Sequence, residues 1–267
     1  KTIWTVNAFD SDNALAVDLT GCVLATQDGG TNWTVQTGGA TLTGVNGAFF
    51  IDRNRGWAAS GYTTVVNGRQ QSIGEIYKTM DGGLIWAPCT GGVARVLNSV
   101  FFADPDRGWA VGAQSTVYRS TDGGTTWAQQ KPKAGGDFQS VHFENGRTGW
   151  IVGSGGRINK TTDGGGTWIS QTGGQNRYLI SVWFLNAEIG WIAGESGLIL
   201  HTEDGGTTWT PQTPGNAEHL YSIFFIDAKT GWACGQLGAV LSTVDGGATW
   251  NSSVSGVSRW LFSIRFT

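Results

Sequence analysis

The chain has 267 residues, of which 43 are glycine and 14 are tryptophan, and its formal net charge is −3. Hydrophobic residues make up 39% of the sequence, enough to bury a large core, which excludes an intrinsically disordered chain. Glycine shows no three-residue period, which excludes collagen. No run of about 18 apolar residues is present that could span a membrane, and the acidic balance argues against a nucleic-acid-binding protein.

One short motif occurs six times: Ser or Thr, one variable residue, Asp-Gly-Gly, two variable residues and Trp. The first two copies are 53 residues apart, and the others follow at intervals of 41 residues. Such an interval is typical of β-propellers, in which each repeat forms one blade. The aspartates of the six motifs are Asp28, Asp81, Asp122, Asp163, Asp204 and Asp245.

A second motif, Gly-Trp followed by small apolar residues, precedes the Asp motif in every repeat but the first. In the first repeat Leu15, Ala16 and Val17 stand in its place. The second repeat carries 11 additional residues at 62–72, which we expect to lengthen a hairpin, either as a tolerated surface extension or as a recognition loop. We interpret the chain, 1–267, as a single domain. Its repeats cover approximately residues 1–40, 41–92, 93–134, 135–175, 176–216 and 217–257, with an extra strand at 258–267.

The fifth repeat shows the predicted elements of one blade in order. Residues 180–185 are rich in β-branched and aromatic side chains and predict a first strand. Residues 190–194 predict the second strand, and a tight turn leads to the third at 198–202. The Asp motif is the next turn, and 208–213 predict the fourth strand. Four strands in each of six repeats predict an all-β propeller with six blades, seven being the alternative.

The chemistry of the Asp motif predicts a structural role. Its carboxylate can accept hydrogen bonds from N–H groups of its own turn, its glycines tolerate positive φ, and its Trp ring can bury a large area. A single carboxylate per motif is too few for a calcium site. The glycines precede no helix, so they do not form a nucleotide-binding loop. The sequence therefore predicts neither a metal site nor a cofactor.

The two motifs carry a family resemblance. The Ser/Thr-x-Asp-x-Gly-x-Thr-Trp pattern resembles the Asp-box, or BNR repeat, of sialidase-like propellers. The residues at 108–112, Gly-Trp-Ala-Val-Gly, and at 120–127, Ser-Thr-Asp-Gly-Gly-Thr-Thr-Trp, more closely resemble repeats of the photosystem II stability/assembly factor family. The resemblance extends over nearly the whole chain, from Ile3, although Asn32 and Ile85 replace the Thr of the motif.

This resemblance implies a propeller that binds a partner protein through an arginine-rich patch on one face. Related repeats are common in secreted bacterial proteins, so we expect an exported protein of the extracellular, periplasmic or thylakoid-lumen type. No targeting segment is visible in the sequence itself.

The last residues form an extra element. Residues 259–266 align with residues 1–8, and both look like the first strand of a repeat. We expect the extra strand to cap an open edge, to exchange into another copy of the chain, or to begin a further region. Because an unpaired strand promotes association, a self-assembling structural protein is an alternative function.

The loops opposite the Asp motifs form the predicted functional face, because the repeats differ there. Two adjacent positions before each first strand vary in charge and aromatic character. Arginine and aromatic side chains are enriched at the centres of protein interfaces, and Arg95 and Arg177 resemble the arginine patch of the family. We therefore predict a partner-binding site. Its candidate residues are Arg95, Arg177, Tyr178, Glu218, His219, Arg259 and Trp260.

No catalytic residue is predicted. The Arg-Ile-Pro motif of sialidases is absent, because Asn159 follows the Arg-Ile pair at 157–158. Asp137, Glu195 and Glu218 lie on the variable face and are the carboxylates that a glycosidase would need in a pair. A sialidase-like glycoside hydrolase is therefore kept as an alternative.

A carbohydrate-binding propeller is a further alternative, with Trp4, Trp183 or Trp260 as stacking platforms. The three cysteines, Cys22, Cys89 and Cys234, have no metal-binding spacing, so we expect them to pack in the core, one disulfide being the alternative. The sequence favours a non-catalytic scaffold that binds a partner protein or another copy of itself.

Overall fold

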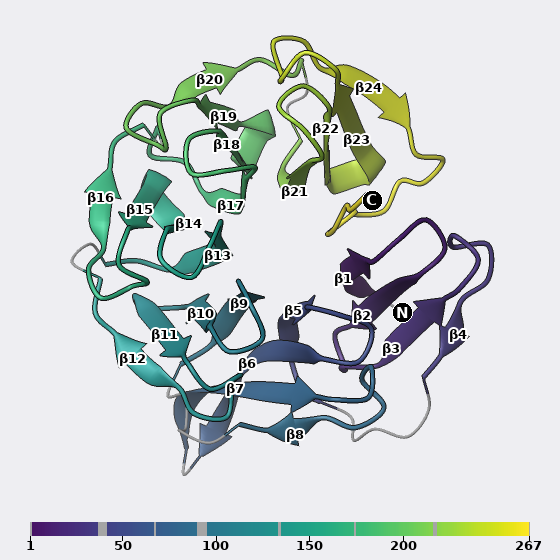
Figure 1. The fold of residues 1–267 in the computed structure, drawn as a ribbon, viewed down its shortest axis with the longest axis vertical. Coiled ribbons are helices and arrows are strands. Elements are labelled where there is room, and N and C mark those ends of the chain that lie inside the picture. The colour runs from purple at the N-terminus through teal and green to yellow at the C-terminus, as the bar shows by residue number, and fades with distance from the viewer. Residues whose placement is uncertain are drawn as a thin grey trace. The chain divides into compact units, whose positions relative to one another are not determined.

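The computed structural model describes residues 2–36, 42–66, 68–89, 95–132, 135–173, 175–215 and 218–266. Within these residues, 24 β-strands assemble into six four-stranded antiparallel sheets (Figure 1). Three turns are of the 3-10 type. The predicted fold class is confirmed: the protein is an all-β propeller with six four-stranded blades. None of the helical turns described is long enough to cross a membrane.

The blades fall into two compact halves, residues 1–130 and 131–266, each of which is described by itself. In each half the strands of a blade follow chain order, as antiparallel neighbours. The N-terminal half holds blade one, β1 (Ile3–Ala8), β2 (Ala14–Asp18), β3 (Val23–Thr26) and β4 (Thr34–Val35); blade two, β5 (Val45–Phe50), β6 (Gly56–Val66), β7 (Arg69–Thr79) and β8 (Ala87–Pro88); and blade three, β9 (Leu97–Phe102), β10 (Gly108–Gly112), β11 (Thr116–Ser120) and β12 (Ala128–Gln130).

The C-terminal half repeats the same plan, with a 3-10 turn between the second and third strands of each blade. It holds blade four, β13 (Phe138–Phe143), β14 (Gly149–Gly153), η1 (Ser154–Gly156), β15 (Arg157–Thr161) and β16 (Ile169–Gln171); blade five, β17 (Leu179–Phe184), β18 (Gly190–Gly194), η2 (Glu195–Gly197), β19 (Ile199–Thr202) and β20 (Thr210–Gln212); and blade six, β21 (Leu220–Phe225), β22 (Gly231–Gly235), η3 (Gln236–Gly238), β23 (Ala239–Thr243) and β24 (Asn251–Val254).

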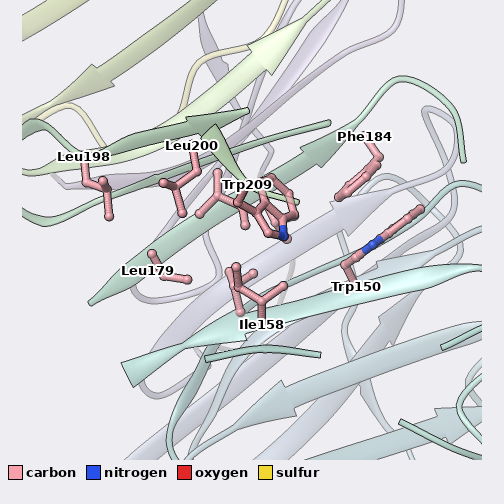
Figure 2. Close-up of a cluster of buried hydrophobic side chains, with 10 residues drawn as sticks. Trp150, Ile158, Leu179, Phe184, Leu198, Leu200 and Trp209 are labelled. Carbon is pink, nitrogen blue, oxygen red and sulfur yellow. The ribbon is translucent and has the colours of Figure 1, made fainter. Parts of the chain in front are cut away.

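The Gly-Trp motif builds the packing between neighbouring blades. The fully buried ring of Trp150 in blade four stacks on Phe184 of blade five, with ring centroids 3.4 Å apart and planes 6° from parallel. Trp209 of the Asp box meets the same Phe184 ring edge-on at 5.8 Å (Figure 2). A Cβ at Gly190 would lie 2.5 Å from Phe184 ring atoms, so glycine is needed where this ring lies on the second strand.

The Asp boxes have the predicted geometry. In blade five the Thr202 hydroxyl donates to Asp204 Oδ1 at 2.8 Å and accepts the Gly206 N–H at 2.8 Å. The Asp204 carboxylate also accepts the backbone N–H and the hydroxyl of Thr208. These bonds, with the Thr208 hydroxyl first, lower the pKa of Asp204 to about 2. In the second box Ile85 supplies only its backbone N–H.

The inserted residues of the second repeat lengthen a hairpin, as predicted. Strands β6 and β7 each run for 11 residues and pair continuously from Gly56 with Thr79 to Val66 with Arg69. Asn67 of this insertion lies outside the described residues. The predicted repeat boundaries near residues 40, 92, 134 and 216 also fall at residues that the structure does not describe.

The extra C-terminal strand packs against blade six. The Leu261 N–H donates to the Gly235 carbonyl oxygen at 2.9 Å, and the Ile264 N–H donates to Ser222 Oγ at 3.3 Å. The same bond joins the first strands of blades five and six, where the Ile223 N–H donates to Ser181 Oγ at 3.2 Å. Residues 261–266 therefore occupy a first-strand position, although they belong to none of the six sheets described.

The three cysteines are free thiols, so the alternative of a disulfide is wrong. Cys234 is buried and its Sγ lies 3.3 Å from the Leu261 carbonyl oxygen. Burial raises the pKa of the Cys234 thiol to about 12 and that of Cys89 to about 11. Both side chains act as packing groups, as expected.

Candidate functional site

The two ends of each blade are built from different loops. In blade five the Gly205 N–H of the Asp box donates to the carbonyl oxygen of Glu188, in the turn between the first and second strands, at 2.8 Å. At the other end, the Glu195 N–H of the turn after the second strand donates to the carbonyl oxygen of Tyr178, just before the first strand, at 3.0 Å. The structure thus separates an Asp-box end from a variable end, as predicted. The variable end carries the candidate residues.

Arg177 and Tyr178 precede β17 and are fixed by turns of two successive blades. The Gly156 N–H in η1 of blade four donates to the Arg177 carbonyl oxygen at 2.6 Å. The Tyr178 N–H donates to Glu195 Oε2 in η2 at 3.0 Å. The backbone is therefore rigidly placed, while the Arg177 side chain is exposed to solvent.

The side chain of Tyr178 is a packing group with a polar tip. Its hydroxyl accepts a hydrogen bond from Gln139 Nε2 at 2.8 Å. Burial, and next the charge of Asp137, raise the pKa of Tyr178, so the phenol stays protonated at neutral pH. Tyr178 can therefore contribute a ring and a hydroxyl to recognition, and it is not a ready nucleophile.

Glu218 and His219 take the same positions before β21. The Gly197 N–H of η2 donates to the Glu218 carbonyl oxygen at 2.8 Å. The Ser196 N–H donates to His219 Nδ1 at 3.0 Å, so Nδ1 is the acceptor of this bond. Both residues are partly buried. The turn of blade five thus fixes this pair, as the turn of blade four fixes the preceding one.

Arg259 and Trp260 take these positions in the C-terminal segment. The Trp260 ring lies 5.8 Å from Tyr221 and 6.1 Å from Phe262, centroid to centroid, and Tyr221 lies 5.1 Å from Phe262. Trp260 still has 53% of its surface exposed, and Arg259 is exposed. The three rings support one another and leave the Trp260 face accessible.

The structure therefore brings three of the predicted pairs to the variable end of the C-terminal half. The seventh candidate, Arg95, lies in the N-terminal half, two residues before β9, and is exposed. The turn after β10 bonds there in the same way, since the Ala113 N–H donates to the Val96 carbonyl oxygen at 2.9 Å. Arg95 is thus the counterpart of Arg177 in its own half.

Arginines at the two ends of the blades differ in their partners. In the turn between β9 and β10, on the Asp-box side, Arg107 Nε lies 2.5 Å from Asp104 Oδ2. Within the described part of the chain, Arg95, Arg177 and Arg259 have no carboxylate partner. These three guanidinium groups are therefore available to a ligand that brings its own negative charge.

Among the carboxylates that were candidates for a glycosidase pair, Glu195 has a structural role. Glu195 Oε2 accepts the Tyr178 N–H and so closes its own blade. Ser154 Oγ and the amide oxygen of Gln236 occupy the equivalent positions of blades four and six and accept the N–H groups of Asp137 and His219. Glu195 is thus one of three interchangeable acceptors for a backbone N–H. Across the described ranges, no three His, Cys, Asp or Glu side chains are placed to hold a metal ion.

Two of the tryptophans considered for sugar stacking are engaged inside the blades. Trp183 Nε1 donates to the Phe225 carbonyl oxygen at 3.0 Å, and its ring lies 4.7 Å from both His142 and Phe224. Trp4 Nε1 donates to the Asn46 carbonyl oxygen. Of the three tryptophans considered, Trp260 is the one whose ring is largely exposed.

One residue of the variable end was missed by the sequence analysis. Leu237 is the middle residue of η3, has φ +53°, and is 61% exposed. Aligning the repeats at 41-residue intervals places it with Gly155 and Ser196, so the exchange of a small residue for leucine was a visible signal. Its backbone conformation was not visible, because it depends on the geometry of the turn.

A sequence profile of the family described as Photosynthesis system II assembly factor YCF48 matches residues 83–173 and 135–216, which together make up half of the chain. The chain belongs to this family. The resemblance inferred from the Gly-Trp and Asp-box motifs is therefore confirmed. A search of curated proteins found no match.

Solved structures give the same fold. The structure of YCF48 bound to D1 peptide has a TM-score of 0.69 and 19% identity, over 96% of this chain and 84% of that chain. YCF48 from Cyanidioschyzon merolae has a TM-score of 0.68 and 17% identity, over 100% and 89%. A GH74 xyloglucanase from Xanthomonas campestris has a TM-score of 0.75 and 14% identity, over 95% of this chain and 45% of the enzyme. At these identities the likeness establishes the propeller fold alone.

Proposed function

We propose that the protein is a non-catalytic scaffold that binds a partner protein through the variable end of its blades. The observation that carries the proposal is the series Arg177–Tyr178, Glu218–His219 and Arg259–Trp260. Each pair is held at one end of the C-terminal half, the first two by hydrogen bonds from the turn of the preceding blade. Rigid backbone with exposed arginine and aromatic side chains is the arrangement that protein interfaces use.

The electrostatics support a ligand with carboxylate groups. Arg177 and Arg259 are exposed and unpaired within the described residues, whereas Arg107 on the Asp-box side is already paired with Asp104. Pairing an exposed arginine with a partner's carboxylate mainly steers association and fixes register. YCF48, a member of the same family, has been solved bound to a D1 peptide, and we extend peptide binding to this chain.

The alternatives have weaker support. The GH74 likeness concerns the fold, and Glu195, the central carboxylate of a possible pair, is hydrogen-bonded within its own blade. The C-terminal segment packs on blade six of its own chain. This packing favours a segment that covers blade six of the same chain, and argues against exchange of the segment between copies. Export is part of the proposal, and recovery of the protein from the extracytoplasmic fraction of its host would support it.

A displayed library of random short peptides tests the proposal. The immobilised chain is panned against the library, and the selected peptides are then titrated against Arg177→Glu and Arg259→Glu variants. We expect peptides with acidic residues to be enriched, and each charge reversal to weaken them by about tenfold. The matched control is Arg147→Glu, which reverses an exposed arginine in the first turn of blade four, on the Asp-box side.

Three results would contradict the proposal. One is the absence of any enriched peptide. Another is equal binding by the wild-type chain and both charge-reversed variants. The last is an equal loss in Arg147→Glu, because this would show a non-specific effect of net charge. Circular dichroism and thermal unfolding of each variant establish that the blades remain folded.

A further inference from the structure

The middle residue of η3 is unusual for its position. In η1, η2 and η3 the middle residues are Gly155, Ser196 and Leu237, with φ of +66°, +52° and +53°. Left-handed backbone suits glycine and is unfavourable for a branched, bulky side chain. The Leu237 side chain is also 61% exposed, so burial in this chain does not compensate for the backbone conformation. An observed outlier of this kind points to a role outside the fold.

The chain wraps closely around η3. The Leu261 N–H bonds to the carbonyl oxygen of Gly235, the residue just before η3. At its other end, Gly238 lies so close to residue 257 that a Cβ added to it would be 1.9 Å from the Val257 carbonyl oxygen. The next residue, Ala239, pairs with Val254. The backbone of residues 254–261 therefore runs alongside η3.

Four apolar side chains are exposed on these two segments. Val254 is 98% exposed, Val257 50% and Trp260 53%, in addition to Leu237. We call these four residues the η3 patch. Tyr221 and Phe262 support the Trp260 ring, so this large side chain is held in place at little entropic cost. Exposed apolar side chains on adjacent backbone segments, one of them with rigid aromatic support, are typical of a binding surface.

The charge around the patch indicates what it binds. Residues 246–266 contain no acidic side chain, and Arg259 within this stretch is exposed and has no carboxylate partner among the described residues. The acidic candidate residue Glu218 lies before β21, and its carbonyl oxygen accepts a hydrogen bond from the Gly197 N–H. An apolar surface beside an unpaired arginine complements a segment that carries both an apolar side chain and a carboxylate.

We propose that the η3 patch is the apolar anchor of the partner-binding site. It takes an aliphatic or aromatic side chain from an extended segment of the partner protein, and a carboxylate near that side chain pairs with Arg259. This inference rests on the proposed function and makes it more specific. It also explains why leucine occupies a left-handed position. The left-handed backbone lowers the stability of the fold, and the leucine side chain raises the affinity for the partner.

The test uses the peptides selected from the library and follows folding and binding separately. In Leu237→Gly the left-handed backbone is unstrained, so we expect the Tm to rise by about 2 °C while peptide affinity falls by about tenfold. Trp260→Ala is expected to weaken the peptides by about tenfold or more. The control Val244→Ser removes an exposed apolar side chain from the Asp box of blade six and should leave the affinity unchanged.

The outcomes separate this inference from the proposed function. If the peptides lose affinity in Arg177→Glu but bind Leu237→Gly and Trp260→Ala normally, the function stands and the anchor is wrong. If no peptide is enriched at all, both fail. If light scattering shows a wild-type dimer that Leu237→Gly dissociates, the patch binds a second copy instead. If a xyloglucan oligosaccharide quenches tryptophan fluorescence in wild type but not in Trp260→Ala, the patch is a sugar platform, which also overturns the proposal.

Discussion

The guanidinium carbon of Arg265 lies 5.4 Å from the centroid of the Trp183 ring and 5.3 Å from that of Phe224. Trp183 in turn lies 4.7 Å from His142. These four residues are 41 positions apart in sequence, so they are the same position of successive first strands. The C-terminal segment thus continues a stack of side chains that runs through β13, β17 and β21. A cation over two aromatic faces holds the segment against Trp183 of blade five and Phe224 of blade six.

Removing this cation should loosen the C-terminal segment. Arg265→Met keeps a long apolar side chain but removes the charge, and we expect a loss of about 1 kcal/mol of local stability. Hydrogen exchange at the Leu261 amide, which bonds to Gly235, should become several-fold faster. The matched change Arg259→Met, at an exposed arginine of the same segment, should leave that exchange rate unchanged. If the Leu261 amide exchanged at the same rate in both variants, the Arg265 cation would not be what holds the C-terminal segment.

Shortening the chain should expose a buried thiol. A chain that ends at Val257 lacks the Leu261 carbonyl group that lies 3.3 Å from Cys234 Sγ. We expect the Cys234 thiol to react rapidly with a thiol reagent at mildly alkaline pH in the shortened chain and slowly in the intact one, because burial raises its pKa to about 12. Cys89, in the N-terminal half, serves as the internal control and should stay unreactive in both.

Light scattering on the same two chains examines the other predicted role of the extra strand. If the segment packs on its own blade, as the structure shows, both chains should have the mass of a monomer, 28.3 kDa for the intact one. An intact chain that assembles while the shortened chain does not would instead show exchange of the segment between copies. In the thiol-labelling experiment, rapid labelling of Cys234 in both chains would contradict the packing of the C-terminal segment over this thiol.

The Asp box shows how much of the fold could be predicted from the sequence. Its hydrogen bonds are local, within four residues of Asp204, so composition and spacing were sufficient to predict them. The packing of the Trp183 ring could not be predicted, because the ring contacts His142 and Phe224, which are 41 positions away in the sequence on either side. The candidate pairs lie directly before the first strands, because the repeat fixes that position. The left-handed turn at Leu237 leaves no signal in hydrophobic periodicity, and only the exchange of a small residue for leucine at this repeat position marks it in the sequence.

The buried hydroxyl of the Asp box should matter more than the exposed one. Thr202→Val removes the acceptor of the Gly206 N–H and leaves this buried donor unpaired, which should cost about 1–3 kcal/mol of unfolding free energy. Thr207→Val removes an exposed hydroxyl that donates to the Asp204 carbonyl oxygen, and it should have little effect. Urea unfolding of both variants measures the difference. A similar loss in both would mean that the turn, and not its buried hydroxyl, determines the stability.

The stack of first-strand side chains also predicts an effect of pH. Burial, and next the charge of Arg265, lower the pKa of His142 from 6.5 to about 3. In the unfolded chain the imidazole binds a proton near pH 6.5, whereas in the folded chain it does so only near pH 3. Above about pH 6.5, His142 therefore does not reduce the free energy of unfolding. As the pH drops from 6.5 toward 3, His142 lowers this free energy by about 1.4 kcal/mol per pH unit.

Replacing this histidine should remove that dependence. Phe101 and Phe224 occupy the same position in blades three and six, so His142→Phe suits the site. Urea unfolding from about pH 6 to about pH 4 should give a steeper loss of stability in wild type than in the variant. The lowered pKa values of His201 and of the Asp-box carboxylates change the stability equally in both proteins, so they do not affect the comparison. Parallel pH profiles for the two proteins would mean that His142 is protonated in the folded state without penalty, and that its packing against Trp183 does not exclude the charged form.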